Sequence, residues 1–190
     1  MELHGSKTEK NLLMAFAGES QARNRYTFFA SVARKEGYEQ IAALFQQTAD
    51  EEKEHGKLFF KLLQGGDVEI TASYPAGKIG DTKSNLAAAA AGELLEWGTL
   101  YPSFAADAEN EGFHDIAVLF KKVSDVEAHH EARYRKLHEN MVKGTVFISE
   151  TPAKWYCRNC GFVHEGKTAP DKCPVCNHPK AHFEIAAENY

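Results

Sequence analysis

Two Glu-x-x-His motifs occur 75 residues apart in this chain, at Glu52–His55 and at Glu127–His130. The segments before them, 37–45 and 112–120, repeat at the same offset. Residues three apart are neighbours on a helix face, so each motif presents a carboxylate and an imidazole together. Glu-x-x-His motifs on two helices of a four-helix bundle hold pairs of metal ions. The repeat therefore predicts a two-metal site.

Four cysteines form a second candidate metal site near the end of the chain. They make two C-x-x-C pairs separated by twelve residues, which is metal-knuckle spacing. Four thiolates bind zinc or iron, and the spacing does not choose between them. Because a redox-active metal pair needs electrons, we favour a mononuclear iron, with zinc as a substitute. The expected ligands are Cys157, Cys160, Cys173 and Cys176.

Apolar periodicity predicts four helices that would position the two Glu-x-x-His motifs. A capping box, Ser6-x-x-Glu9, marks the first start, and glycines at 37, 65–66 and 112 mark ends. The predicted helices run from Ser6 to about Lys35, through Ile41–Leu62, from near Ser84 to Gly112, and through Ile116–Leu137.

The connections between these helices predict the architecture. Short turns after the first and third helices make antiparallel pairs, and residues 65 to about 83 form a crossover between the pairs. We therefore predict a mainly α protein with a ferritin-like four-helix bundle over residues 1–146. Gly144 to Pro152 link it to a small C-terminal module, residues 147–190, which needs its metal to fold.

Composition limits the function further. The chain has 190 residues, is 43% hydrophobic and carries a net charge of −5, which supports a packed core and excludes a polybasic nucleic-acid surface. The polar start lacks a signal-peptide stretch, and the longest apolar run, Leu86–Ala91, is too short to span a bilayer. We expect a soluble cytoplasmic protein without nucleic-acid or membrane partners. Clustered cysteines in such a protein favour metal over disulfides.

Five acidic side chains fall on the apolar stripes of the predicted helices: Glu19, Glu52, Glu93, Glu96 and Glu127. An unpaired buried carboxylate is costly, so it either takes up a proton or binds a cation. Oxygen ligands with two imidazoles suit iron or manganese and leave positions open for oxygen chemistry. One such glutamate could be a solvated residue at a helix edge. Five, with two repeat-matched histidines, favour a metal site.

The two halves differ around the acidic residues. Glu19 reaches Glu93 at an offset of 74, a slip of one residue from the general repeat. At the shifted offset Glu96 opposes an alanine, so the third helix supplies an additional carboxylate. One metal ion could therefore exchange Glu96 for His55 when its redox state changes.

Other polar residues of these helices receive lesser roles. Tyr26 and Tyr101 lie about two turns from Glu19 and Glu93, where they could hydrogen-bond ligand carboxylates or be ordinary core tyrosines, and the sequence favours neither. Four residues are expected to point away from the site toward solvent: Asp50, Glu51, Glu54 and His129.

The whole pattern resembles the rubrerythrins. The supporting segments are Phe16–Tyr26, Glu52-x-x-His55, Glu93-x-x-Glu96, Tyr101-Pro-Ser-Phe104, Glu127-x-x-His130 and a rubredoxin-like Cys157–Cys176. Together they cover nearly all of residues 6–190. The resemblance implies a ferritin-like di-iron bundle fused to a rubredoxin-like iron domain, in a homodimer.

Carried over position by position, the resemblance assigns the di-iron ligands to Glu19, Glu52, His55, Glu93, Glu96, Glu127 and His130. Glu52 and Glu127 match the metal-bridging carboxylates of the family, and the exchange of Glu96 for His55 matches its ligand switch. Asn177 replaces a knuckle glycine, which could tune the potential of the thiolate iron without preventing metal binding.

The implied function is that of a non-haem di-iron peroxidase in oxidative-stress defence. Hydrogen peroxide, two electrons and two protons would give two waters. The four-cysteine iron would relay electrons from an external donor such as rubredoxin or its NADH-dependent reductase.

Two other functions fit parts of the sequence. Iron oxidation and storage of the ferritin type needs a large hollow assembly, and the additional Glu96 and the fused thiolate module argue against it. A regulatory protein with a zinc ribbon and a structural bundle would be colourless and contain only zinc.

Overall fold

The first helix begins where its capping box predicts. In the computed structural model, which describes residues 2–189, α1 spans Lys7–Lys35. Ser6 Oγ accepts a hydrogen bond from the Glu9 N–H at 3.0 Å, and Glu9 Oε2 accepts one from the Gly5 N–H at 2.7 Å. Gly37, with a positive φ of 85°, then turns the chain into α2, Glu39–Phe60.

The third predicted helix is interrupted, which corrects the expectation of one continuous α-helix from near Ser84 to Gly112. It consists of α3, Thr82–Leu95, a π-helical turn η1, Glu96–Leu100, and α4, Tyr101–Asn110. A π turn accommodates one extra residue. It lies between Glu93 and Tyr101, so it accounts for the slip of one residue between the two halves of the repeat. α5, His114–Val142, completes the bundle.

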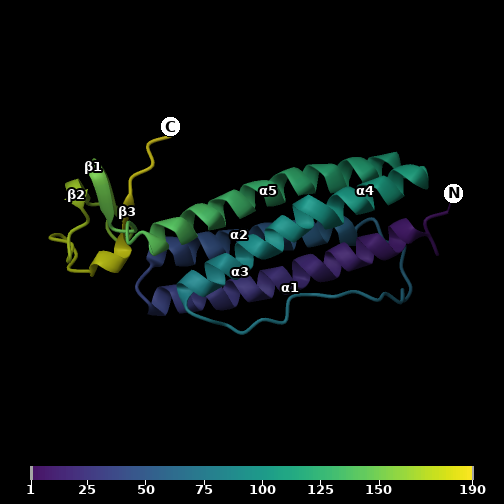
Figure 1. The fold of residues 1–190 in the computed structure, drawn as a ribbon, viewed down its shortest axis with the longest axis horizontal. Coiled ribbons are helices and arrows are strands. Elements are labelled where there is room, and N and C mark those ends of the chain that lie inside the picture. The colour runs from purple at the N-terminus through teal and green to yellow at the C-terminus, as the bar shows by residue number, and fades with distance from the viewer. Residues whose placement is uncertain (1, 190) are drawn as a thin grey trace.

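The helices pack as two antiparallel pairs, α1 with α2 and α3–α4 with α5. The crossover between α2 and α3 runs back along the bundle beside α1 (Figure 1). Tyr74 holds it there, because its hydroxyl donates a hydrogen bond to the Met14 carbonyl oxygen at 2.8 Å. The mainly α, ferritin-like architecture predicted from the sequence is confirmed.

Aromatic side chains fill the bundle on both sides of its acidic residues. Along α2, Phe45 belongs to one buried cluster and Phe59 to another, and Glu52 lies between them. The same order holds along α5, where Phe120 and Tyr134 flank Glu127. The acidic residues are therefore buried between two aromatic clusters. Within residues 2–189, no helix is long and apolar enough to cross a membrane.

A small antiparallel sheet lies beyond the end of α5 (Figure 1). Its strand order is β2-β1-β3, with β1 at Ile148–Cys157, β2 at Val163–Thr168 and β3 at Phe183–Ile185. A one-turn helix η2, Lys180–His182, precedes β3. The expected linker from Gly144 to Pro152 is therefore partly a strand, whose pairing is irregular between Ile148 and Ala153.

Candidate metal centre

Two glutamates and two histidines form the symmetric centre of the bundle. Glu52 Oε2 and Glu127 Oε1 each lie 2.9 Å from His55 Nδ1. Their other oxygens face His130 Nδ1, Glu52 Oε1 at 3.1 Å and Glu127 Oε2 at 2.8 Å. The two imidazole rings stack with their centroids 5.8 Å apart. Each carboxylate thus faces both histidines and is placed to bridge two ions.

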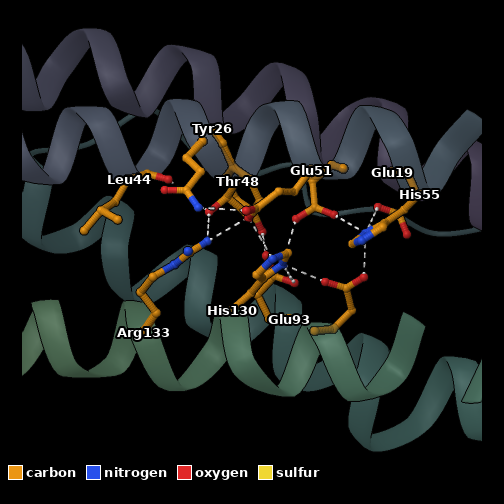
Figure 2. Close-up of polar contacts among 12 residues, drawn as sticks. Glu19, Tyr26, Leu44, Thr48, Glu51, His55, Glu93, His130 and Arg133 are labelled. Atoms are coloured by element: carbon orange, nitrogen blue, oxygen red, sulfur yellow. Dashed lines mark hydrogen bonds and ion pairs between the residues drawn. The ribbon is translucent and has the colours of Figure 1, made fainter. Parts of the chain in front are cut away.

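One further glutamate completes each half of this centre. Glu19 Oε2 lies 3.7 Å from His55 Nδ1, and Glu93 Oε2 lies 4.0 Å from His130 Nδ1 (Figure 2). The donor atoms within each half lie within 4.8 Å of one another. The two groups are Glu19, Glu52, His55 and Glu127, and Glu52, Glu93, Glu127 and His130.

The donor set fits metal ions. Six of its buried atoms make no well-directed hydrogen bond among the residues described, although several of them lie at ion-pair distance from one another or from His55: Glu19 Oε2, Glu52 Oε1, Glu93 Oε2, both carboxylate oxygens of Glu127, and His130 Nδ1. Buried polar atoms are normally satisfied, so unpartnered oxygens that converge on one place require a cation or protons. Carboxylate and imidazole donors suit iron or manganese.

Without a metal, the centre retains protons. Burial, followed by repulsion from Glu52, raises the pKa values of Glu19 and Glu93 well above their usual range. Although burial opposes it, the close contacts with His130 and His55 lower the pKa of Glu52 to about 2. Although burial also opposes it, the facing carboxylates raise the pKa of His130 to about 9 and that of His55 further. Protons therefore supply the positive charge that a metal pair would bring.

Two tyrosines hold the outer glutamates. The Tyr26 hydroxyl donates to Glu93 Oε1 at 2.5 Å, and the Tyr101 hydroxyl donates to Glu19 Oε1. Burial, together with the nearby carboxylates, raises both tyrosine pKa values, so the hydroxyls remain donors. Of the two interpretations left open by the sequence, the structure supports the hydrogen-bonding role. Each phenol binds one oxygen of a glutamate carboxylate and so orients the other oxygen toward a histidine.

Glu96 lies outside both groups of four. It begins the π turn η1, is 8% exposed, and lines a cavity between α1 and the crossover. Burial, followed by repulsion from Glu127, raises its pKa well above the usual range. In this structure His55, and not Glu96, belongs to the group of four that contains Glu19.

Glu51 departs from the expectation that it points away toward solvent. Its Oε2 lies 3.1 Å from His130 Nε2, on the side of the imidazole opposite the carboxylates, and 3.0 Å from an Arg133 nitrogen (Figure 2). Arg133 also donates to Thr48 Oγ1 at 2.5 Å. No role for Arg133 could be predicted from its place on the helix. The signal was available in the spacing, since Thr48 and Glu51 are three residues apart and Thr48 lies on the ligand stripe.

The other three residues expected to face solvent do so. Asp50, Glu54 and His129 are exposed, and Glu54 pairs with Lys57 at 2.7 Å. The error at Glu51 therefore concerns one side chain at the edge of the ligand stripe.

The four cysteines meet in the C-terminal module. Their Sγ atoms lie within 4.8 Å of one another, with Cys157 to Cys176 at 3.8 Å and Cys160 to Cys173 at 3.6 Å. Asn177 has a positive φ of 60° and takes the place that Gly161, at 80°, has in the other knuckle. The two knuckles are thus alike in backbone despite the different residues.

Cys160 and Cys176 differ in how readily they lose their protons. Although a hydrogen bond from the Phe162 N–H opposes it, desolvation and the neighbouring sulfurs raise the pKa of Cys160 to about 12. A hydrogen bond from the His178 N–H lowers the pKa of Cys176 to about 5. Trp155 and Phe183 are almost fully buried behind the sulfurs, whereas Cys160 is exposed. One edge of this four-cysteine site therefore faces outward.

Comparisons with known proteins agree on one family. The rubrerythrin family model matches residues 10–138, and the model of the rubrerythrin rubredoxin-like domain matches residues 155–184. The chain is 60% identical to rubrerythrin of Porphyromonas gingivalis over 99% of this chain and 94% of that protein. It is 54% identical to rubrerythrin of Nitratidesulfovibrio vulgaris, over 99% and 98%. A solved structure of nigerythrin in a mixed-valence state matches with a TM-score of 0.62 and 32% identity, over 97% of this chain and 91% of that one.

Proposed function

The chain belongs to the rubrerythrin family, and on this premise we propose that it reduces hydrogen peroxide to water at a di-iron centre. The family and the donor set imply iron. We assign the metal ligands to Glu19, Glu52, His55, Glu93, Glu127 and His130, with Glu96 as a seventh ligand that exchanges with His55. The bundle would comprise residues 1–146 and the thiolate domain residues 147–190.

One observation carries this proposal: the two four-residue groups share Glu52 and Glu127, and each shared carboxylate presents one oxygen to each histidine. These two shared carboxylates would hold a pair of metal ions side by side. A bound ferrous pair would supply the two electrons that cleavage of the peroxide O–O bond requires.

The protein's own side chains would bind the metal pair, orient its ligands and shield the site from water. The shared glutamates fix the spacing of the pair, and Tyr26 and Tyr101 hold the outer glutamates in place through hydrogen bonds. The aromatic clusters on both sides exclude water, which strengthens electrostatic interactions within the site. Glu51 Oε2 lies 3.1 Å from His130 Nε2, where it would favour the tautomer that leaves Nδ1 free for a metal.

The four-cysteine iron would return electrons one at a time. Its exposed edge at Cys160 suits docking of an external donor such as rubredoxin or an NADH-dependent reductase. The thiolate domain lies at one end of the bundle, beyond α5 (Figure 1). We therefore propose a homodimer, in which a partner's thiolate iron could serve a given di-iron site, working in the cytoplasm in oxidative-stress defence.

The test is to reduce iron-loaded protein anaerobically, add one equivalent of hydrogen peroxide and follow the visible absorbance of the thiolate iron. We expect rapid re-oxidation in the parent protein. Re-oxidation should be lost in Glu52→Ala and Glu127→Ala, whose thiolate iron remains bound.

The matched control is Glu139→Ala, about three turns further along α5, where Glu139 is half exposed beside Lys143. It should re-oxidise like the parent. A thiolate band that stays reduced in the parent while peroxide survives would exclude peroxidase activity and favour iron storage.

A further inference from the structure

A cavity of about 160 Å³ lies beside the candidate di-iron centre, beneath the crossover segment. Its walls come from α1, α3, η1 and α4, and residues 72–75 of the crossover form its roof. Its lining includes Glu96, Tyr26 and Tyr101, which belong to or contact the candidate metal centre, and also the polar side chains of Gln21 and Arg25. Both tyrosines also contact glutamates of the metal centre. The cavity therefore adjoins the reacting site and is not a separate surface feature.

The rest of the cavity wall is largely apolar. Met14, Ala15, Leu95, Leu100 and Phe104 contribute to it. Hydrogen peroxide is small and polar and has no group that would use such a wall. An apolar cavity of about 150 Å³ can hold a molecule the size of benzene, and a tert-butyl group is of similar size.

We propose that this cavity binds the alkyl group of small alkyl hydroperoxides, and that the protein reduces these compounds as well as hydrogen peroxide. The hydroperoxide end would point to Glu96, Tyr26 and Tyr101, and the alkyl end would lie against the apolar wall. The proposal rests on the peroxidase function proposed above and extends it to a second substrate class.

The reaction balances with the same reductant. The O–O bond of ROOH breaks, two electrons enter from the external electron-transfer donor through the metal sites, and each oxygen takes up a proton. The products are one alcohol, ROH, and one water. No further oxidant or reductant is required.

Gly18 and Tyr74 set the size of the cavity. A Cβ atom at Gly18 would lie 3.7 Å from Tyr74 Cε1 and 3.9 Å from Glu96 Oε1, so a side chain there would grow between roof and floor. These are ordinary contact distances, and Gly18 lies inside α1, where alanine is the better helix former. Gly18→Ala should therefore fold well and narrow the cavity, and Gly18→Leu should fill it.

The activity test compares tert-butyl hydroperoxide with hydrogen peroxide at equal iron content. The parent should reduce both. Loss of a fitting apolar contact costs roughly 10–200-fold in kcat/KM, so Gly18→Leu should lower kcat/KM for the alkyl substrate at least about tenfold more than for hydrogen peroxide. Gly18→Ala should give a kcat/KM for the alkyl substrate between those of the parent and Gly18→Leu. If the parent reduces neither substrate, the proposed peroxidase function itself is wrong. If the parent reduces hydrogen peroxide but not tert-butyl hydroperoxide, only the present inference is wrong.

The roof supplies an independent variant. Cumene hydroperoxide carries a phenyl ring besides its branched alkyl group and is too large for a cavity of about 160 Å³ beneath the crossover, so the parent should reduce it poorly. Tyr74→Ala removes the roof and should raise kcat/KM for cumene hydroperoxide relative to that for hydrogen peroxide. Tyr74→Phe keeps the ring and should leave this ratio unchanged. Equal use of both alkyl substrates by the parent and all variants would overturn the proposal.

A binding measurement removes any dependence on turnover. tert-Butanol, the alcohol product, should bind to zinc-loaded protein in ligand-observed NMR. This signal should persist in Tyr74→Phe and disappear in Gly18→Leu. Binding that is unchanged by Gly18→Leu would place the alkyl group elsewhere and contradict the assignment of the cavity.

Discussion

At the scale of single residues, the acceptor behind His130 determines how firmly that histidine can hold a metal. Glu51 Oε2 lies 3.1 Å from His130 Nε2 and is itself held by Arg133. A hydrogen-bonded partner fixes the imidazole tautomer and increases its basicity. Glu51 therefore supports metal binding although it is not placed as a ligand.

Glu51→Ala should weaken metal binding at the bundle site by about 10–100-fold, the usual cost of removing such a partner. A chelator competition with zinc or ferrous iron measures this directly. Glu54→Ala is the matched control, because Glu54 is exposed on the same helix and pairs only with Lys57 at 2.7 Å among the contacts described. Equal affinities for the two variants would remove Glu51 from the metal centre.

Most residues of the candidate metal centre could be predicted from the sequence, but the role of Glu51 could not, for a physical reason. Helical periodicity places Glu52 and Glu127 inside because each lies on the apolar stripe of its own helix. Glu51 lies beside that stripe, and its position depends on His130 and Arg133 of α5. Contacts between helices of this kind are not encoded in the period of either helix, so only the assembled bundle reveals them.

At the scale of elements, the π turn η1 keeps two functional residues in phase. In a regular α-helix seven residues complete about 1.9 turns and eight about 2.2 turns. Glu19 and Tyr26 are seven apart on α1, whereas Glu93 and Tyr101 are eight apart, and yet both pairs face the core. The π turn absorbs the extra residue. The slip in the repeat signalled an insertion, but its form depends on how the backbone accommodates it.

Deletion of Gly98, inside the π turn, should therefore be tolerated. It leaves Glu93 and Tyr101 seven residues apart, as in α1, so both would still face the core of a regular helix. We expect circular dichroism near that of the parent and a loss of about 1–2 kcal/mol, which is a few degrees in Tm at this size.

The comparison for this deletion is removal of Val126 from α5, where the structure has no π turn to lose. That deletion rotates His130 and Tyr134 by about 100° relative to Val123. It should abolish metal binding and cooperative unfolding. If the two deletions are equally damaging, the π turn does not act as a phase correction.

At the scale of the whole molecule, metal and protons compete for one enclosed centre. Five of the buried glutamates of the bundle, with two histidines, lie between the aromatic clusters. The four-helix order could be predicted because it follows from periodicity and loop lengths. The cavity beneath the crossover could not, because that segment has no periodic pattern and is positioned by single contacts such as Tyr74 with Met14.

This competition predicts how the metal-free protein responds to pH. Glu19, Glu93 and Glu96 have raised pKa values, so when folded they keep protons that the unfolded chain releases above about pH 4.5. His130, whose pKa is raised to about 9, keeps its proton in the folded state between about pH 6.5 and 9, where the unfolded chain releases it. Since the folded state binds more protons than the unfolded state, stability should fall as pH rises through this range. The pKa of Glu52 is lowered to about 2, so its contribution to stability is already complete a little above pH 4.5. It therefore does not oppose the fall in stability at higher pH.

Denaturant unfolding of metal-free protein should therefore give a lower free energy of unfolding at pH 9 than at pH 6. The contribution of His130 alone is roughly 1–3 kcal/mol, at 1.36 kcal/mol per unit of pKa change. His130→Ala should reduce this difference, whereas His129→Ala, which changes the exposed neighbour, should not. Loading the bundle with zinc or iron should abolish or reverse the difference, because the metal replaces the protons and binds better to deprotonated ligands. A metal-free protein that is more stable at pH 9 than at pH 6 would mean that protons do not take the place of the metal in this centre.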